Sequence, residues 1–432
     1  MTERGVLSLA VAIFVCRAVI AAFVIPPWQG PDEPPHYVMA EQVARGAIDD
    51  QAVRARLEAQ VLRSMAANNW WRPYRLTTPD PVPTRFSQEP DHLGVGAMVL
   101  PVYYLLAGGI LRMSGAAPLE ERYFLLRVVS VCLSALTIVM AYAGTRLLFD
   151  RVTASVVALL AAFHPQFLFT ALSATPDALA NAFGALLWWQ GARVFLYGSV
   201  DAALVTIVAA LAATLTKRNA VPLLAVSGIA MIAGMPQRVS RRAAVVAMAA
   251  GCLASIVVAL WFISSPIEWI AQLRYQWYIT LFQSPAARDF SLRRFATFTL
   301  GLIDSSWLVA GWLRFPAPWW WLMTVRALTI VSVAGVVRAF IRQPGLRPPL
   351  AFTIAAAAVM MVAAVANGLM TGPAPQGRYL FVVAPPLAVL FWIGLREWWP
   401  PALRHLAPAA FVALVFALDV SGWITTLLPA YV

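Results

Sequence analysis

Apolar runs of about 20 residues recur along this chain, and they constrain its fold more than any other feature. A run of that length crosses a bilayer as one α-helix, which satisfies its own backbone hydrogen bonds in lipid. Hydrophobic residues make up 61% of the 432 residues and charged residues only 12%. The runs lack the alternating pattern of membrane barrel strands. The sequence therefore predicts an all-α polytopic membrane protein.

The apolar runs predict about eleven spans in a single transmembrane domain covering residues 1–432. We expect them near residues 5–25, 123–144, 152–172, 176–195, 201–216, 219–234, 243–263, 320–340, 350–370, 379–395 and 406–427. The first run lacks a convincing small-residue cleavage site, so we expect it to remain as an uncleaved signal anchor. Loops at 26–122 and 264–318 separate this span from spans 2–7 (123–263) and spans 8–11 (320–427).

The segment 95–112 decides the topology. It is apolar but contains Pro101 and three glycines. If it does not span, the arginines between spans gather on the cytoplasmic side, as the positive-inside rule requires. We therefore expect an interfacial or re-entrant helix inside a large first extracytoplasmic loop, with the N-terminus cytoplasmic. The formal charge of +12 then reflects topology and not nucleic-acid binding.

With this topology, the unusual polar residues gather on the extracytoplasmic side. They are Asp32, Glu33, His36, Arg127, Asp177, Lys217, Arg218, Arg274 and Arg378. Lys217 is the only lysine of the chain and interrupts an apolar stretch. A cation at such a break is costly in lipid and usually has a partner or a function. Carboxylates beside cations indicate chemistry on a lipid phosphate at the membrane surface.

A series of short motifs resembles the GT-C glycosyltransferases, which are integral membrane enzymes. The stretch Asp32-Glu33-Pro34-Pro35-His36 resembles their first outer loop. Further matches, in order, are "LPVYYLL" at 100–106, "LRVVS" at 126–130, "FHPQFLFTALSATPDALAN" around Asp177, Thr216-Lys217, "SSWLVAGWL" at 305–313 and "QGRYL" at 376–380. Within that group the chain most resembles a bacterial family of predicted membrane proteins of unknown function, related to protein O-mannosyltransferases and lipid A aminoarabinose transferases. The family often has His-Pro-Pro before the paired tyrosines, where this chain has Val99-Leu100-Pro101.

The resemblance implies a GT-C-like bundle and a transferase of the bacterial inner membrane. Such an enzyme passes a sugar from a polyprenyl-phosphate carrier to an envelope glycan, lipid or protein acceptor on the extracytoplasmic face. The reaction needs a base for the acceptor hydroxyl, cations for the departing phosphate and a groove for the isoprenoid tail. We expect Asp32 to be the base, its pKa raised by desolvation and by Glu33, which orients the acceptor or shares the proton. The expected substrate-binding residues are His36, Arg127, Asp177, Lys217 and Arg378.

Each of these residues also has a structural interpretation. Asp32 and Glu33 are suited to cap a helix that starts near residue 34. Asp177 follows Thr175-Pro176, as in many helix N-termini. His36 is favoured as a local hydrogen-bond partner, because no second histidine stands at metal-ligand spacing. Arg378, Lys217 and Arg127 are alternatively interface anchors or partners of nearby carboxylates.

Two further questions stay open at this level. A transporter or flippase for a lipid-linked sugar or an isoprenoid carrier is the alternative function; it needs ionisable residues near the midplane and broken helices in repeated halves. Arg17 is the clearest ionisable residue within an expected span. A divalent cation, Mg²⁺ or Mn²⁺, is compatible with neighbouring carboxylates but is not required by them. The sequence identifies neither the sugar nor the acceptor.

Overall fold

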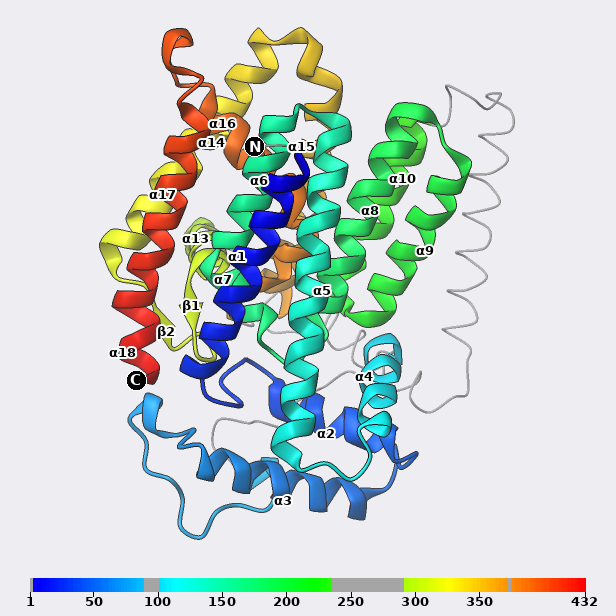
Figure 1. The fold of residues 1–432 in the computed structure, drawn as a ribbon, viewed down its shortest axis with the longest axis vertical. Coiled ribbons are helices and arrows are strands. Elements are labelled where there is room, and N and C mark those ends of the chain that lie inside the picture. The colour runs from blue at the N-terminus through cyan, green and yellow to red at the C-terminus, as the bar shows by residue number, and fades with distance from the viewer. Residues whose placement is uncertain (1–2, 89–100, 235–290, 372–373) are drawn as a thin grey trace.

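The computed structural model describes residues 3–88, 101–234, 291–371 and 374–432. In this part of the chain the regular structure is helical except for two short strands, β1 (Val309–Ala310) and β2 (Phe315–Pro316), which pair antiparallel. Figure 1 shows long helices standing side by side, with α1 descending from the N-terminus and α17 ending near the C-terminus at the opposite end. The predicted all-α class is confirmed.

The long helices form the bundle. They are α1 (Glu3–Val24), α5 (Leu119–Leu148), α6 (Arg151–Phe163), α8 (Asp177–Tyr197), α9 (Val200–Thr216), α10 (Leu223–Gly234), α13 (Leu292–Trp307), α14 (Trp319–Arg342), α15 (Arg347–Thr371), α16 (Ala384–Arg396) and α17 (Ala407–Gly422). Six described segments are long and apolar enough to cross a membrane: Gly5–Val24, Leu119–Leu148, Trp319–Arg342, Pro344–Leu369, Gly377–Arg396 and Ala407–Tyr431. The expected span at 243–263 lies outside the described residues, so the total of about eleven stays a prediction.

Two of the expected spans are irregular. In 152–172, α6 and α7 (Pro165–Ala171) meet at a bend of 63°. Pro165 has no N–H and disfavours helical dihedrals in the residue before it, so His164 adopts an extended conformation and separates the helices. In 379–395, a 3₁₀ segment, η8 (Gly377–Val383), precedes α16. Non-helical backbone at such positions is tolerated where the protein itself surrounds it.

Three helices form the lower layer: α2 (Glu33–Ala44), α3 (Gln51–Ala67) and α4 (Pro101–Met113). Figure 1 shows α2 and α3 lying across the lower end of the bundle, with α4 upright above them. Asp50 caps α3, accepting from the backbone N–H groups of Ala52 and Val53. α4 packs against α2 so closely that a Cβ at Gly108 would lie 2.6 Å from Val43 Cγ1. The described part of α4 has 13 residues. Residues 95–100 of the expected 95–112 helix lie outside the described residues, so the expectation that 95–112 does not cross stays a prediction.

The remaining elements are short. They are η1 (Arg72–Tyr74), η2 (Phe86–Gln88), η3 (Arg218–Ala220), η7 (Pro344–Leu346), η9 (Pro401–Leu403), η10 (Trp423–Leu427) and α18 (Leu428–Tyr431).

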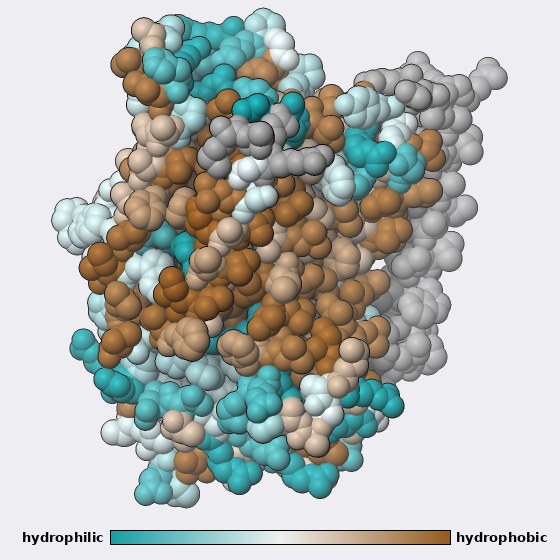
Figure 2. Space-filling model, in the orientation of Figure 1, coloured by the Kyte–Doolittle hydropathy of each residue, from teal (hydrophilic) through white to brown (hydrophobic). Residues whose placement is uncertain are grey.

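Figure 2 shows a broad hydrophobic band over the bundle, between hydrophilic surfaces at the upper end and over the lower layer. This distribution is typical of a protein whose middle faces lipid.

The lower layer provides a direct test of the predicted topology. Labelling of single cysteines should place Gly115, which follows α4, outside the cell, and Arg151, which begins α6, inside. This result is expected because α5 carries the chain from the lower layer to the other end of the bundle. A membrane-impermeant reagent that reached Arg151 but not Gly115 in intact cells would reverse the orientation.

Candidate active site

Asp32 lies directly before α2, where the chain leaves α1 for the lower layer. Its backbone has φ 66°, a left-handed conformation that aspartate and asparagine tolerate better than most residues. The side chain is 45% exposed and makes no capping hydrogen bond to the described first turn of α2. Asp32 therefore occupies the N-cap position of α2, as the capping interpretation expected, but its side chain does not provide the cap.

Arg378 reaches Asp32 from the other end of the chain. Its Nη2 donates to Asp32 Oδ2. Nη1 donates to the carbonyl oxygen of Pro31 at 3.2 Å, and Nε donates to Gln376 Oε1 at 2.8 Å. The Arg378 side chain is only 7% exposed. Three contacts therefore orient its guanidinium toward the start of α2.

The backbone before Arg378 packs tightly against α13. The Gly377 N–H donates to Ser305 Oγ at 2.8 Å, and Ser305 Oγ donates in turn to the carbonyl oxygen of Pro375 at 2.9 Å. A Cβ at Gly377 would lie 2.0 Å from the backbone nitrogen of Ser306. Only glycine fits here, which accounts for Gly377 in "QGRYL" and for Ser305 in "SSWLVAGWL".

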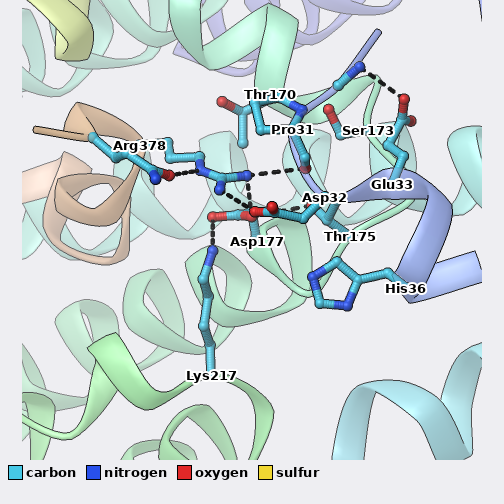
Figure 3. Close-up of polar contacts among 12 residues, drawn as sticks. Pro31, Asp32, Glu33, His36, Thr170, Ser173, Thr175, Asp177, Lys217 and Arg378 are labelled. Atoms are coloured by element: carbon cyan, nitrogen blue, oxygen red, sulfur yellow. Dashed lines mark hydrogen bonds and ion pairs between the residues drawn. The ribbon is translucent and has the colours of Figure 1, made fainter. Parts of the chain in front are cut away.

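Asp177 joins Arg378 to Lys217. Lys217 Nζ donates to Asp177 Oδ1, and Thr175 Oγ1 donates to Asp177 Oδ2 at 3.0 Å. Arg378 Nη1 lies 3.5 Å from the same Oδ2. Figure 3 shows these side chains converging from α8, the end of α9, η8 and the start of α2. Asp32, Asp177, Lys217 and Arg378 together form the ion-pair cluster.

The charges in this cluster set the protonation states. Burial pushes the pKa of Asp32 up, but the adjacent Arg378 and other cationic groups outweigh it and hold the pKa below its usual value. The expected upward shift is therefore wrong. Burial lowers the pKa of Lys217 to about 8, although its pairing with Asp177 opposes the shift. Asp32 is thus ionised at neutral pH, and Lys217 is mostly protonated.

His36 lies one helical turn after Asp32 on α2. Its Nδ1 is 2.6 Å from the hydroxyl oxygen of Tyr104 on α4, and its ring also packs near Tyr103. Burial lowers the pKa of His36 to about 4 despite the attraction of Asp32, so the imidazole is neutral at physiological pH. His36 thus has a hydrogen-bond partner, but one that stands 68 residues away in the sequence; its expected part in substrate binding stays a prediction.

Glu33 and Arg127 form a second, separate cluster. Glu33 is fully buried; its Oε1 accepts from Tyr123 Oη at 2.7 Å and from the Ala174 N–H at 2.9 Å. Its Oε2 accepts from the Gly30 N–H at 2.8 Å. Arg127 Nε lies 3.7 Å from Glu33 Oε1, and its other nitrogens donate to backbone carbonyls at the end of α1. Figure 3 shows Glu33 turned away from Asp32.

The structure therefore brings Asp32, Asp177, Lys217 and Arg378 together, places His36 beside them, and sets Glu33 and Arg127 apart. Sequence reasoning did not assign roles to four neighbouring residues. Thr175, Gln376 and Tyr379 contact the ion-pair cluster, and Tyr104 contacts His36 beside it. The Tyr379 ring centroid lies 5.0 Å from Lys217 Nζ and 5.5 Å from Arg378 Cζ. All four lie inside the motifs quoted above, so these motifs were the sequence signal that could have identified them.

Within the ranges that the structure describes, no three His, Cys, Asp or Glu side chains lie close enough to share a metal ion. Both carboxylates of the ion-pair cluster also face Arg378, whose positive charge disfavours a metal at the same oxygens. Positive charge at this site comes from Arg378 and Lys217.

An apolar cavity of about 240 Å³ lies inside the bundle. Its lining includes His164, Phe167, Trp307, Leu380, Phe381 and Phe391. Leu380 and Phe381 belong to η8, the same segment that carries Arg378. Two residues of the cavity lining therefore follow Arg378 closely in the sequence.

The fold and the site define a helical membrane protein with a cluster of carboxylates and cations. Comparison with known proteins finds one matching family. Residues 95–262 match the model of the dolichyl-phosphate-mannose-protein mannosyltransferase family. This match supports the resemblance to the GT-C superfamily of glycosyltransferases. No curated protein matches the sequence.

Two solved structures are similar to the chain. They are the archaeal oligosaccharyltransferase AglB from Archaeoglobus fulgidus in complex with an inhibitory peptide and a dolichol-phosphate, and the Archaeoglobus fulgidus oligosaccharyltransferase in the apo form. Each has a TM-score of 0.48 and 14% identity, over 96% and 99% of this chain respectively. The chain spans 55% of the length of each.

Proposed function

We propose that this protein is a GT-C-type glycosyltransferase that moves a sugar from a polyprenyl-phosphate carrier to an envelope glycan, lipid or protein acceptor. The proposed site faces the extracytoplasmic side of a bacterial inner membrane. The observation that carries the proposal is the ion-pair cluster, in which the half-exposed Asp32 pairs with Arg378, and Lys217 pairs with the neighbouring Asp177. The family match over residues 95–262 supports the same class of reaction.

In the proposed reaction, an acceptor hydroxyl oxygen bonds to the anomeric carbon of the donor sugar while the bond from that carbon to the carrier phosphate oxygen breaks. The hydroxyl proton passes to Asp32, and the electron pair of the broken bond stays on the phosphate. Arg378 and Lys217 stabilise the resulting charge, and Asp177 holds both cations in place. The sugar carries oxocarbenium-like charge in the transition state.

The lowered pKa of Asp32 suits this role in one respect and limits it in another. The carboxylate is ionised at neutral pH and can accept a proton. It is a weak base, so the acceptor proton transfers only as the new carbon–oxygen bond forms and acidifies the hydroxyl. Leu380 and Phe381 line the apolar cavity and belong to the same segment, η8, as Arg378. We propose this cavity as the groove for the isoprenoid tail.

The function is tested by incubating purified protein with a polyprenyl-phosphate sugar and measuring loss of the donor and release of the carrier phosphate. The transporter alternative would use charges inside the bundle, such as the ion pair between Arg17 on α1 and Asp419 on α17. These two charges neutralise each other, and Arg17 also donates to the carbonyl oxygen of Ala162. Movement of an intact donor across liposomes without its consumption would favour the transporter.

Donor binding should weaken as pH rises through about 8, because Lys217 loses its positive charge above its pKa of about 8. The loss of one charge-assisted contact corresponds to roughly tenfold in affinity or more. Lys217→Arg should keep the charge and move this loss to higher pH, since arginine stays protonated. The measurement is donor affinity from about pH 6 to pH 10; a wild-type affinity that does not change over this range would exclude the phosphate contact of Lys217.

Glu33→Ala should destabilise the fold by something on the order of 3 kcal/mol, because it leaves the charge of Arg127 and three buried donors without their acceptor. Glu33→Gln should be milder. Thermal unfolding in detergent measures the effect, and the exposed Glu121→Gln on α5 is the control, expected within about 0.5 kcal/mol of wild type. Unchanged stability with lost turnover would instead give Glu33 a chemical role.

A further inference from the structure

A large cavity lies in the lower layer, apart from the ion-pair cluster. Its volume is about 780 Å³, within the range of pockets that hold organic ligands. It is lined by α2, α3, the end of α4 with the following turn, and the start of α5. Figure 2 shows that the surface over this layer is hydrophilic and lies below the hydrophobic band.

The floor of the cavity is an ordered ion pair. Arg122 donates to both oxygens of Glu41, from Nε at 2.6 Å and from Nη2 at 2.9 Å. Tyr37 Oη donates to Glu41 Oε1 at 2.9 Å, and Arg122 Nη1 donates to Ser114 Oγ at 3.0 Å. Both charged groups are buried and neutralise each other. The floor is therefore preformed and needs no ligand to satisfy it.

The mouth of the cavity is positive. Arg45, Arg63 and Arg112 line it and are exposed. Arg45 pairs with the floor residue Glu41 at 3.2 Å, whereas Arg63 and Arg112 have no acidic partner among the described residues. Among the described residues that line the cavity, Glu120 is the only acidic one besides Glu41. Guanidinium groups match the geometry of carboxylates and phosphates, so this mouth is suited to an anionic ligand.

We propose that this cavity binds an acidic saccharide, a glycan segment that carries uronate carboxylates or phosphates, as part of the acceptor. The inference rests on the proposed function and names the class of acceptor. The arginines at the mouth would bind the acidic groups, and the exposed Gln60 offers an amide for sugar hydroxyls. A saccharide fits better than lipid tails because the cavity lies in the hydrophilic layer.

The cavity lies on a different side of α2 from Asp32. Tyr37 and Glu41, one turn apart, line the cavity, whereas His36 contacts Tyr104 beside Asp32. At 1.5 Å per residue, Glu41 lies about 13 Å along the helix from Asp32. A ligand in the cavity would therefore anchor a part of the acceptor remote from the reacting hydroxyl, which affects acceptor KM more than kcat.

The test measures binding of trigalacturonate and of neutral maltotriose to the full-length protein in detergent at low salt. We expect trigalacturonate alone to bind, and Arg63→Gln/Arg112→Gln to weaken it about tenfold or more. Arg56→Gln, an exposed arginine on α3 outside the cavity lining, is the matched control and should bind as wild type does. With an acidic acceptor, the double variant should raise KM and leave kcat unchanged.

The outcomes separate this inference from the proposed function. If the protein consumes the donor but trigalacturonate does not bind, or binds equally to the double variant, the cavity assignment is overturned and the transferase stands. If trigalacturonate binds through Arg63 and Arg112 but no donor is consumed, the saccharide site stands and the transferase falls. Displacement of trigalacturonate by phosphatidylglycerol nanodiscs, and not by maltotriose, would assign the arginines to a lipid headgroup and overturn the saccharide.

Discussion

Asp32→Asn should lower turnover by roughly 10²-fold or more, because an amide cannot accept the proton of the acceptor hydroxyl. Folding should stay nearly intact. Asparagine tolerates the left-handed backbone of residue 32, its oxygen can still accept from Arg378, and the side chain makes no cap to α2 in the described structure. Donor binding should change little, since both cations remain.

The control is Asp49→Asn, which removes an exposed carboxylate from the turn between α2 and α3 and should not change turnover. Asp32→Glu tests position, because it keeps the base but moves it by one methylene; intermediate activity is expected. If Asp32→Asn retained full transferase activity in a folded preparation, Asp32 would not be the base. Asp177 is then the remaining carboxylate of the cluster, because Glu33 is turned away from it.

Arg378→Ala should weaken donor binding by something on the order of 1.5 to 3 kcal/mol and also lower turnover, because it removes the cation shared by Asp32 and Asp177. The two carboxylates would then lie near each other with Lys217 as their neighbouring cation. Two anions beside an incoming phosphate oppose its binding. Donor affinity measured in detergent, together with single-turnover rates, separates the effect on binding from the effect on chemistry.

Arg378→Lys is the informative companion to this variant. It keeps the charge, but an ammonium lacks the planar fork of donors with which the guanidinium contacts Asp32, Pro31 and Gln376 at once. The donor affinity of Arg378→Lys should therefore fall between those of wild type and Arg378→Ala. Arg72→Ala, an exposed arginine in η1, should leave donor affinity as in wild type. Donor affinity unchanged in both Arg378 variants would remove the proposed phosphate pocket.

The class of fold and many helix positions followed from the sequence. Long apolar runs are local signals, since a helix in lipid satisfies its own backbone groups whatever its neighbours are. The helices α1, α5 and α14 accordingly lie close to the predicted spans. The bend at His164 was missed, although Pro165 was visible, because a proline in a membrane helix does not by itself determine whether the helix kinks or breaks.

The gathering of polar residues was also predictable in part. Asp177, Lys217 and Arg378 each stand beside an expected span end, and the resemblance to known motifs suggested that they act together. Their mutual contacts were not predictable, because the ion pair of Asp32 and Arg378 joins residues 346 positions apart. No local pattern in the sequence reports a pairing of that separation.

What the sequence by itself determined was therefore the helical membrane class and the presence of carboxylates and cations near span ends. Only the tertiary structure decided that Asp32 faces the cations while its neighbour Glu33 is buried against Tyr123. Successive residues at a helix start point about 100° apart, so the packing of α2 selects which carboxylate is exposed. The same packing decided the protonation of Asp32: the sequence suggested repulsion from Glu33 and a raised pKa, whereas contact with Arg378 lowers it.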